Sequence, residues 1–255
     1  MLLTIDVGNT NTVLGLFDAG RLHKSWRIKT DARSTADELH VTVRALLAGQ
    51  PDVTGVSLCS TVPAVLREMR VMLEKTFDGV PHVIVEPGVR TGVPVLTDNP
   101  KEVGSDRIVN TLAAFALFGG PCIVVDFGTS TNLDVVSAKG EFLGGALAPG
   151  VEISLDALAQ RAAQLRKVEL TRPRAAIGKN TVEALQSGAL YGFAGQVDGL
   201  VTRIVAELEG SVTAVVATGG LASLIVPEST TITHHEPELT LTGLRLLFER
   251  VQSQR

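Results

Sequence analysis

The apolar stretch LLTIDVGNT, residues 2–10, returns later in the chain as CIVVDFGTS, residues 122–130. Both copies consist of a run typical of a buried strand, followed by an Asp-x-Gly turn that carries Asn, Thr or Ser. Asp6 thereby corresponds to Asp126, an offset of 126 − 6 = 120 residues. One such turn is a weak signal, but two turns in the same strand context indicate an internal duplication.

The segments around the two copies also correspond. Each copy continues into two expected strands joined by a glycine turn, and Gly20 takes the place of Gly140 in this alignment. These strands are expected at residues 12–17, 22–28, 133–137 and 141–147, and further strands at 53–60, 80–85 and 214–217. Helices are expected at residues 35–47, 62–77, 106–117, 151–166, 179–208 and 240–252. This alternation predicts an α/β chain of two similar domains, an N-terminal one at 1–120 and a C-terminal one at 121–255.

The composition restricts the class of protein. The chain has 255 residues, of which 45% are hydrophobic and 20% charged, enough apolar material for a sizeable core. The net charge is −4 and basic residues form no run, which argues against nucleic acid and membrane surfaces as partners. The chain has two cysteines, and we find no signal peptide or membrane-spanning run in it. We therefore expect a cytoplasmic location.

The two turns have the composition of a phosphate-binding site. Glycine permits close approach of a ligand to backbone N–H groups, and the side chains of Asn9, Thr10, Thr129 and Ser130 would add polar contacts. The aspartate suits a cation that a phosphate also binds. Two such turns facing each other would hold a polyphosphate, although each could instead be a tight hairpin with a polar tip. Gly219-Gly220, after an expected strand, is a candidate platform for adenine, and the chain has no Walker A motif.

A third motif, Gly104-Ser105-Asp106-Arg107, closes a long Gly/Pro-rich segment at residues 86–104. Ser105 could cap the helix expected after it, and Asp106 would suit the positive end of that helix. Helix capping leaves Arg107 unexplained, because a fixed guanidinium suits a carboxylate or phosphate. The alternative reading is a general base, Asp106, beside a substrate anchor.

Together the three motifs resemble those of type III pantothenate kinases, in order and spacing, over essentially the whole chain. The resemblance implies two actin-like, ribonuclease-H-like domains of the sugar kinase/Hsp70/actin ATPase type. It implies ATP-dependent phosphorylation of pantothenate to 4′-phosphopantothenate, the first step of coenzyme A biosynthesis. It further implies a homodimer that requires magnesium and a monovalent cation, potassium or ammonium.

The resemblance also assigns roles by position. Asp106 would be the catalytic proton acceptor, and Asp126 would bind the monovalent cation. Asp6 would hold magnesium, directly or through a water molecule. The residues implied to bind ATP are Asp6, Val7, Gly8, Asn9, Thr10, Asn11, Thr12, Val13 and Thr129. The residues implied to bind pantothenate are Gly104, Ser105, Asp106, Arg107 and, from the partner subunit of the dimer, Thr181.

The sequence departs from the family pattern at two places. Thr97 stands where many members carry a tyrosine, and Thr129-Ser130-Thr131 replaces the commoner Thr-Ala-Thr. Two alternatives to a pantothenate kinase remain at this point. One is another actin-like kinase or a polyphosphate phosphatase, and the other is a non-catalytic ATP-sensing protein, since the family also includes transcriptional accessory factors.

Overall fold

The computed structural model describes residues 1–86, 88–162, 168–208 and 210–254. Packing contacts group the chain into two units. Unit 1 comprises Met1–Val93, Asn99–Ala113 and Leu239–Arg255, and unit 2 comprises Pro94–Asp98 and Ala114–Glu238. The C-terminal helix thus packs with the N-terminal segment. The domain boundary at residue 120 stays a prediction.

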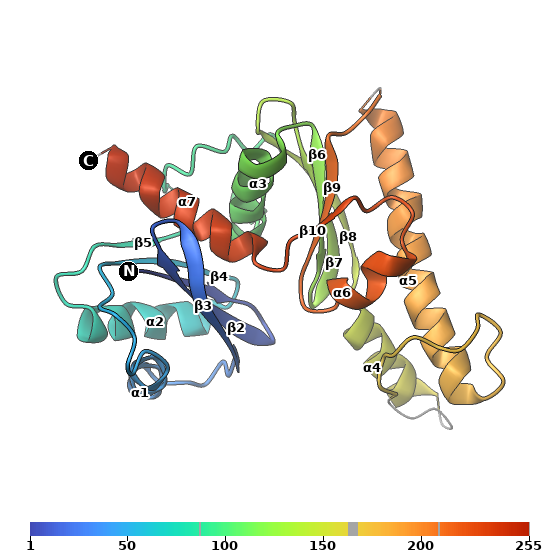
Figure 1. The fold of residues 1–255 in the computed structure, drawn as a ribbon, viewed down its shortest axis with the longest axis horizontal. Coiled ribbons are helices and arrows are strands. Elements are labelled where there is room, and N and C mark those ends of the chain that lie inside the picture. Colours follow the sequence, from blue (N-terminus) through green and yellow to red (C-terminus); the bar gives the residue numbers. More distant parts are fainter. Residues whose placement is uncertain (87, 163–167, 209, 255) are drawn as a thin grey trace. The chain divides into compact units, whose positions relative to one another are not determined.

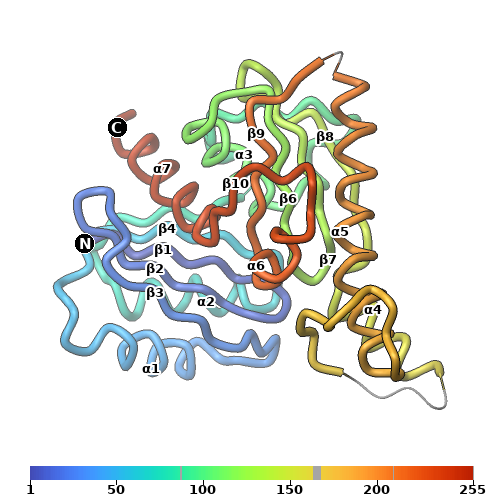
Figure 2. The backbone as a smooth tube through the Cα atoms, turned by 45° about the vertical axis from the view of Figure 1, so that its right-hand side comes forward, coloured from blue at the N-terminus to red at the C-terminus, as the bar shows by residue number. Residues whose placement is uncertain are grey.

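Unit 1 is built on a five-stranded mixed sheet of order β3-β2-β1-β4-β5. Central strand β1 pairs antiparallel with β2 and parallel with β4. Helices α1 and α2 cover one face of the sheet and α7 the other (Figures 1 and 2). The elements are β1 (Leu2–Val7), β2 (Asn11–Asp18), β3 (Arg21–Lys29), α1 (Ala36–Leu46), β4 (Gly55–Ser60), α2 (Pro63–Thr76), β5 (His82–Ile84), η1 (Pro100–Glu102), the start of α3 (Ser105–Phe118) and α7 (Leu239–Ser253).

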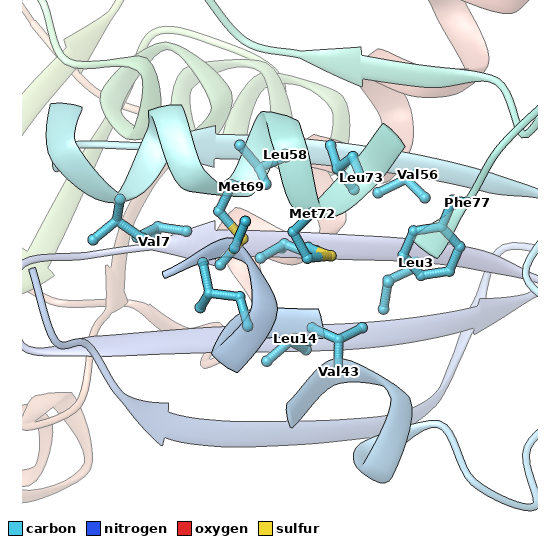
Figure 3. Close-up of a cluster of buried hydrophobic side chains, with 14 of the residues drawn as sticks. Leu3, Val7, Leu14, Val43, Val56, Leu58, Met69, Met72, Leu73 and Phe77 are labelled. Carbon is cyan, nitrogen blue, oxygen red and sulfur yellow. The ribbon is translucent and has the colours of Figure 1, made fainter. Parts of the chain in front are cut away.

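The alternation of side chains along β1 decides which of them reach the functional face. Leu3, Ile5 and Val7 are fully buried and pack beneath α1 and α2, together with Met69 and Met72 of α2 (Figure 3). Successive strand residues point to opposite faces. Asp6 therefore projects from the other face of the sheet, towards the α7 and α3 side.

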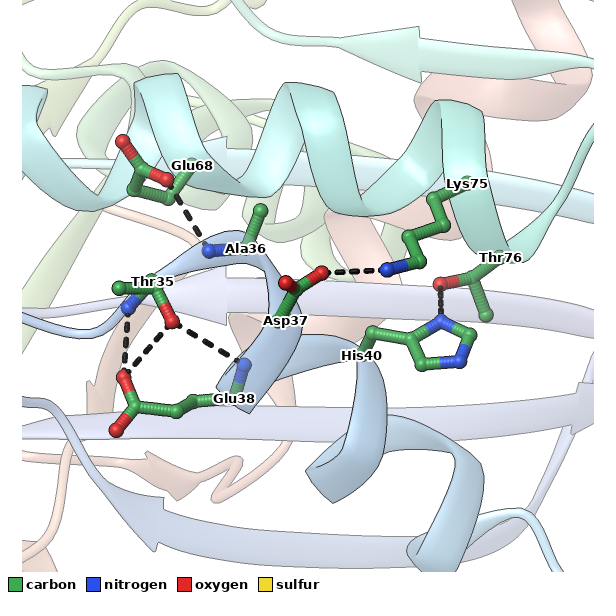
Figure 4. Close-up of polar contacts among 8 residues, drawn as sticks. All are labelled: Thr35, Ala36, Asp37, Glu38, His40, Glu68, Lys75 and Thr76. Carbon is green, nitrogen blue, oxygen red and sulfur yellow. Dashed lines mark hydrogen bonds and ion pairs between the residues drawn. The ribbon is translucent and has the colours of Figure 1, made fainter.

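Helix α1 begins where the sequence predicts. Thr35 and Glu38 form a capping box, in which each side chain bonds to the other residue's backbone N–H. An ion pair between Lys75 and Asp37 and a hydrogen bond between His40 and Thr76 join α1 to α2 (Figure 4). These contacts hold the helical layer together on the face opposite Asp6.

Unit 2 repeats the topology of unit 1. Its sheet has the order β10-β9-β6-β7-β8, with β6 antiparallel to β7 and parallel to β9. Leu190, Ala194 and Val197 of the 27-residue helix α5 pack in its core. The elements are β6 (Cys122–Phe127), β7 (Ser130–Val136), β8 (Phe142–Pro149), α4 (Val151–Arg161), α5 (Thr181–Glu207), β9 (Ala214–Thr218), α6 (Ala222–Ile225), η2 (Val226–Glu228) and β10 (His234–His235). The α/β fold class and the duplication are confirmed.

The two repeats differ at the Asp-x-Gly turns. In unit 1, Val7 pairs with Thr12, whereas in unit 2 Phe127 pairs with Thr131. Under the 120-residue offset, Thr12 corresponds to position 132, so the second turn is one residue shorter. The backbone N–H of Gly8 accordingly bonds to the carbonyl of Asn11, three residues on, and that of Gly128 to the carbonyl of Ser130, two residues on.

Most expected elements are present, with shifted ends. The strand expected at 80–85 is confined to His82–Ile84, and the helix expected at 151–166 is seen over Val151–Arg161. Residues 163–166 of that expectation lie outside the described residues. Strand β10 was not expected. Among the described residues, no helix is long and apolar enough to cross a membrane.

Candidate active site

Three elements of unit 1 meet around Asp6. Cys59 of β4 lies beside Asp6 in the parallel pairing of β1 with β4, and its Sγ donates a hydrogen bond of 3.3 Å to Asp6 Oδ1. Cys59 is completely buried. Burial raises the pKa of its thiol, so the thiol keeps the proton that it donates. The carboxylate of Asp6 is thereby fixed from the β4 side.

The start of α3 brings the Gly104–Arg107 motif to the same place. Ser105 is the first residue of α3, and its hydroxyl donates to the carbonyl of Ser60 at the end of β4, at 3.3 Å. A Cβ on Gly104 would lie 2.5 Å from Asp106 Oδ1, so glycine makes room for the Asp106 carboxylate. That Oδ1 is shielded from solvent and accepts no hydrogen bond from the described residues. A buried acceptor of this kind is suited to a ligand donor or a cation.

The carboxyl groups of Asp6 and Asp106 both have raised pKa values. Burial, then the negative charge of Asp106, raises the pKa of Asp6 to about 7. The hydrogen bond from Cys59 and the charge of Arg27 act in the opposite direction. Burial likewise raises the pKa of Asp106, against a hydrogen bond from the backbone of Arg107. Two neighbouring carboxyl groups are costly to ionise together in a buried place. A bound cation, or a proton taken up from a substrate, is therefore stabilised between them.

The first turn presents only part of the predicted ATP-binding set. Asn9 and Thr10 are exposed at its tip, whereas Val7 is fully buried in the apolar core. Thr12 is 2% exposed, and its hydroxyl bonds to that of Thr30 at 2.8 Å. Any contact of Val7 or Thr12 with a nucleotide would therefore be through the backbone. Of the rest of the set, Gly8, Asn11 and Val13 are half-buried.

In unit 2, Asp126 is the second-last residue of β6, and its carboxylate lies close to Gly219. Asp126 pairs with Thr218 of β9, and Gly219 follows with a φ of 94°. A Cβ on Gly219 would lie 2.5 Å from Asp126 Oδ1 and 2.6 Å from the carbonyl oxygen of Phe127. The two oxygens thus lie together against the backbone of Gly219, in a space that only glycine fits. Carboxylate and carbonyl oxygens are ligands that suit a hard cation such as potassium.

The second turn lies at the N-terminus of a helix. The backbone N–H of Gly150 donates to the carbonyl of Thr129 at 3.1 Å, and α4 begins at the next residue. A Cβ on Gly150 would lie 2.3 Å from that carbonyl oxygen. Exposed Thr129 is therefore held beside the positive end of α4, an arrangement that favours anions such as phosphate.

Thr181 is exposed and is the first residue of α5. Asn180 caps this helix by accepting from the backbone N–H of Glu183 at 2.9 Å. Glu183 in turn accepts from Arg174 and from the backbone of Lys179, so the segment before Thr181 is pinned to its own helix. The side chain of Thr97, at the position that departs from the family pattern, has a buried hydroxyl without a hydrogen-bond partner among the described residues.

The described residues contain no group of three or more His, Cys, Asp or Glu side chains arranged to hold a metal ion. Magnesium is commonly bound by one or two carboxylates together with substrate phosphates, rather than by a protein cage. Asp6, with its raised pKa, and the unsatisfied oxygen of Asp106 fit that pattern. The residues present therefore fit a divalent ion that arrives with a nucleotide.

Sequence reasoning alone missed two contributors. Cys59 lies in an apolar strand run and fills the core, but it also bonds to Asp6. Its role depends on β4 lying parallel to β1 in this register, which no local pattern encodes. Gly150 was not expected to matter. Its position between an apolar strand and a helix is a usable signal, because glycine at that junction permits close backbone approach.

Comparison with known proteins gives a consistent assignment. The family model described as type III pantothenate kinase matches residues 2–203. A type III pantothenate kinase of Frankia alni is 70% identical over 98% of this chain and 99% of its own length. The corresponding protein of Salinispora arenicola is 66% identical, also over 98% of this chain and 99% of its own length.

Solved structures of low identity support the fold. A Campylobacter jejuni protein named as a candidate Baf family transcriptional activator superposes with a TM-score of 0.62 at 17% identity, covering 98% of this chain and 99% of its own. The ROK hexokinase of Thermus thermophilus gives a TM-score of 0.55 at 16% identity, with the same coverage. These likenesses show the actin-like, ROK-type kinase fold. The chain belongs to the type III pantothenate kinase family, whose members phosphorylate pantothenate with ATP in the first step of coenzyme A biosynthesis.

Proposed function

We propose that this kinase uses Asp106 as the acceptor base and Asp6 as the carboxylate that meets the nucleotide-bound metal. The oxygen of the pantothenate hydroxyl forms a bond to the γ-phosphorus of ATP as the bond from that phosphorus to ADP breaks. The hydroxyl proton passes to a carboxylate oxygen of Asp106. The observation that carries this role is the buried Asp106 Oδ1, which lacks a donor among the described residues.

The remaining acceptor residues position the substrate. Gly104 leaves space for the Asp106 carboxylate, and Ser105 ties the start of α3 to β4. Arg107 supplies the positive charge that the carboxylate of pantothenate requires. Chemistry of this type needs little covalent help from the protein, because positioning and charge stabilisation dominate phosphoryl transfer.

Magnesium, bound with ATP, would neutralise charge that develops on the phosphates. Asp6 would hold it, directly or through a water molecule, while Cys59 keeps the Asp6 carboxylate in place. Backbone and side chains of the first turn, at residues 8–11, would bind the phosphates. In unit 2, Thr129 and the N-terminus of α4 offer a further phosphate contact.

The ion at Asp126 is proposed to be potassium or ammonium. The support is the pair of oxygen atoms, from the Asp126 carboxylate and the Phe127 carbonyl, that lie together beside Gly219. Gly219→Ala would place a Cβ within 2.6 Å of both oxygens and at a φ of 94°. We expect the wild type to turn over faster in potassium than in sodium buffer, and this variant to lose that difference.

A cytoplasmic homodimer completes the proposal, with Thr181 reaching the acceptor site of the partner subunit. Unit 2 exposes large apolar side chains near Thr181, including Ile177 at 75% and Val182 at 49%. Apolar surface marks a protein interface when such side chains form a contiguous patch. The dimer is carried by the family resemblance and supported by this surface.

The experiment is to incubate the purified protein with ATP, magnesium and potassium, with and without pantothenate. Mass spectrometry should detect 4′-phosphopantothenate, and ADP should form only when pantothenate is present. ADP formation without pantothenate would instead indicate an ATPase. Nucleotide binding with no turnover would indicate a sensing protein.

A further inference from the structure

The face of the unit 1 sheet that carries Asp6 also carries a cation with no structural task. Arg27 lies on β3, the edge strand of the sheet. Its neighbours Trp26 and Ile28 pack against the apolar core beneath α1 and α2. Because side chains alternate along a strand, Arg27 projects from the opposite face, the one from which Asp6 projects.

The strand register places Arg27 in the same row as Asp6. Asp6 of β1 pairs with Val13 of β2, and Val13 pairs with Arg27 of β3. Cys59 of β4 lies on the other side of Asp6 in this row. Two strand spacings, about 10 Å, separate the backbones of Asp6 and Arg27. A long arginine side chain directed from β3 towards β1 spans most of this distance, because only the short side chain of Val13 lies between them.

Arg27 is available for a ligand. Its side chain is exposed, and it forms no hydrogen bond or ion pair with any residue that the structure describes. Its charge nevertheless reaches Asp6, whose carboxyl group it stabilises in the ionised form. Lys29 projects from the same face but lies opposite Asn11. Arg27 is thus the cation in the row of Asp6 itself.

We propose that Arg27 is a further catalytic residue, which contacts the γ-phosphate of ATP bound at the first turn. The proposal rests on the phosphoryl transfer described above. As phosphoryl transfer proceeds, negative charge is redistributed over the γ-phosphate oxygens, between two carboxylates that repel it. A guanidinium donates in a planar fork that matches phosphate oxygens, and it remains charged at all working pH values. It would stabilise the transferring group from the β3 side.

The test compares Arg27→Gln with Lys24→Gln. Lys24 is a cation on the same strand but on the opposite face, 5.2 Å from the ring centre of Trp26. We expect Arg27→Gln to lower kcat about 10²-fold, the scale seen when one preorganised donor to a developing charge is removed. Lys24→Gln should keep kcat within about twofold of the wild type, because surface changes away from a site have small effects. Arg27→Lys should be intermediate, since it keeps the charge but not the planar fork.

A binding measurement separates this proposal from the proposed reaction. Titration calorimetry in the presence of magnesium measures the binding of a non-hydrolysable ATP analogue and of ADP to the wild type and to Arg27→Gln. The substitution should weaken binding of the analogue at least about tenfold more than it weakens binding of ADP. Equal weakening of the two nucleotides, or kcat within threefold of an active wild type, would overturn the role of Arg27. Absence of product from the wild type would overturn the kinase reaction, while the comparison of nucleotides would still decide whether Arg27 meets a γ-phosphate.

Discussion

At the residue scale, the proposed chemistry depends on two carboxylates, Asp6 and Asp106, whose pKa values are raised by burial. Asp6 and Asp106 come from different elements, a strand end and a helix start, and meet in unit 1. The isolated motifs do not predict this meeting, because it depends on the packing of α3 against β4. The sequence does single out both residues as candidates, since each lies two residues from a glycine, in a turn or at a helix start.

The raised pKa of Asp6 predicts opposite pH trends for stability and for nucleotide binding. The folded state holds the Asp6 proton up to about pH 7, whereas the unfolded chain releases it near the ordinary value of 3.8. The contribution of Asp6 to stability should therefore fall as pH rises from about 4 to 7 and stay constant above. Binding of magnesium and ATP needs the ionised form, so it should strengthen over the upper part of that range.

The measurement is the melting temperature of the ligand-free protein from pH 5 to 8, for the wild type and Asp6→Asn. The difference between the two proteins isolates Asp6 from the other titrating groups. We expect the melting temperature of the wild type to fall, relative to that of Asp6→Asn, as pH rises. A difference that is independent of pH over this range would contradict the raised pKa.

At the element scale, the long helix α5 is anchored to the segment before β10 by one carboxylate. Asp198 accepts five hydrogen bonds from the side chains and backbone of Ser229, Thr230 and Thr231. Burial alone would raise the pKa of Asp198, but these hydrogen bonds outweigh it and lower the pKa to about 2. Asp198 thus fixes the position of α5 relative to residues 229–231 in unit 2.

Asp198→Asn should destabilise the protein by roughly 2 kcal/mol, because hydrogen bonds to a charged acceptor are lost. The stabilisation should be present above about pH 4 and decline as pH falls towards 2, since the folded pKa lies below the unfolded one. Denaturant unfolding at pH 7 and at pH 3 measures both effects. Glu207→Gln is the control, an exposed acid of the same helix. Equal stability of the two variants at pH 7 would exclude the anchor.

The elements also show what the sequence could and could not predict. Strand β6 matches the expected residues, and the capping box of Thr35 and Glu38 is confirmed, because local chemistry decides both. The sequence does not predict that the second turn is one residue shorter. Asp6-x-Gly8 aligns with Asp126-x-Gly128 without a gap, and the difference in length appears only in the strand pairing after the glycine. The two-residue strand β10 exists only through its pairing with β9 and has no pattern of its own.

At the scale of the whole molecule, the duplicated motif predicts two similar α/β halves, and the structure has two five-stranded sheets of the same topology. The C-terminal helix packing with unit 1 was not predicted, because its apolar face alone does not identify its partner. The assignment to the kinase family was also accessible from sequence, since three motifs at their spacing are far more specific than any one. The roles of individual site residues stay predictions.

The proposed dimer predicts that two inactive variants restore each other. In the proposed dimer, each acceptor site takes Asp106 from one subunit and Thr181 from the other. Asp106→Asn and Thr181→Arg therefore damage residues that different subunits contribute to the same site. Mixed dimers then contain one intact site, so co-refolding equal amounts should recover about a quarter of wild-type turnover. Thr202→Arg, an exposed position on the same helix, should instead be active on its own. Failure of the mixture to exceed its separate components would contradict a shared site.

The most direct test of the account is the turnover of Asp106→Asn, measured as 4′-phosphopantothenate formed in the presence of ATP, magnesium and potassium. Asparagine keeps the size of the side chain but cannot accept the proton, so kcat should fall about 10²- to 10⁴-fold with ATP binding nearly unchanged. If Asp106 served only the helix start, the variant would lose about 1 kcal/mol of stability and keep its turnover. A kcat within about tenfold of the wild type would contradict the assignment of Asp106 as the acceptor base.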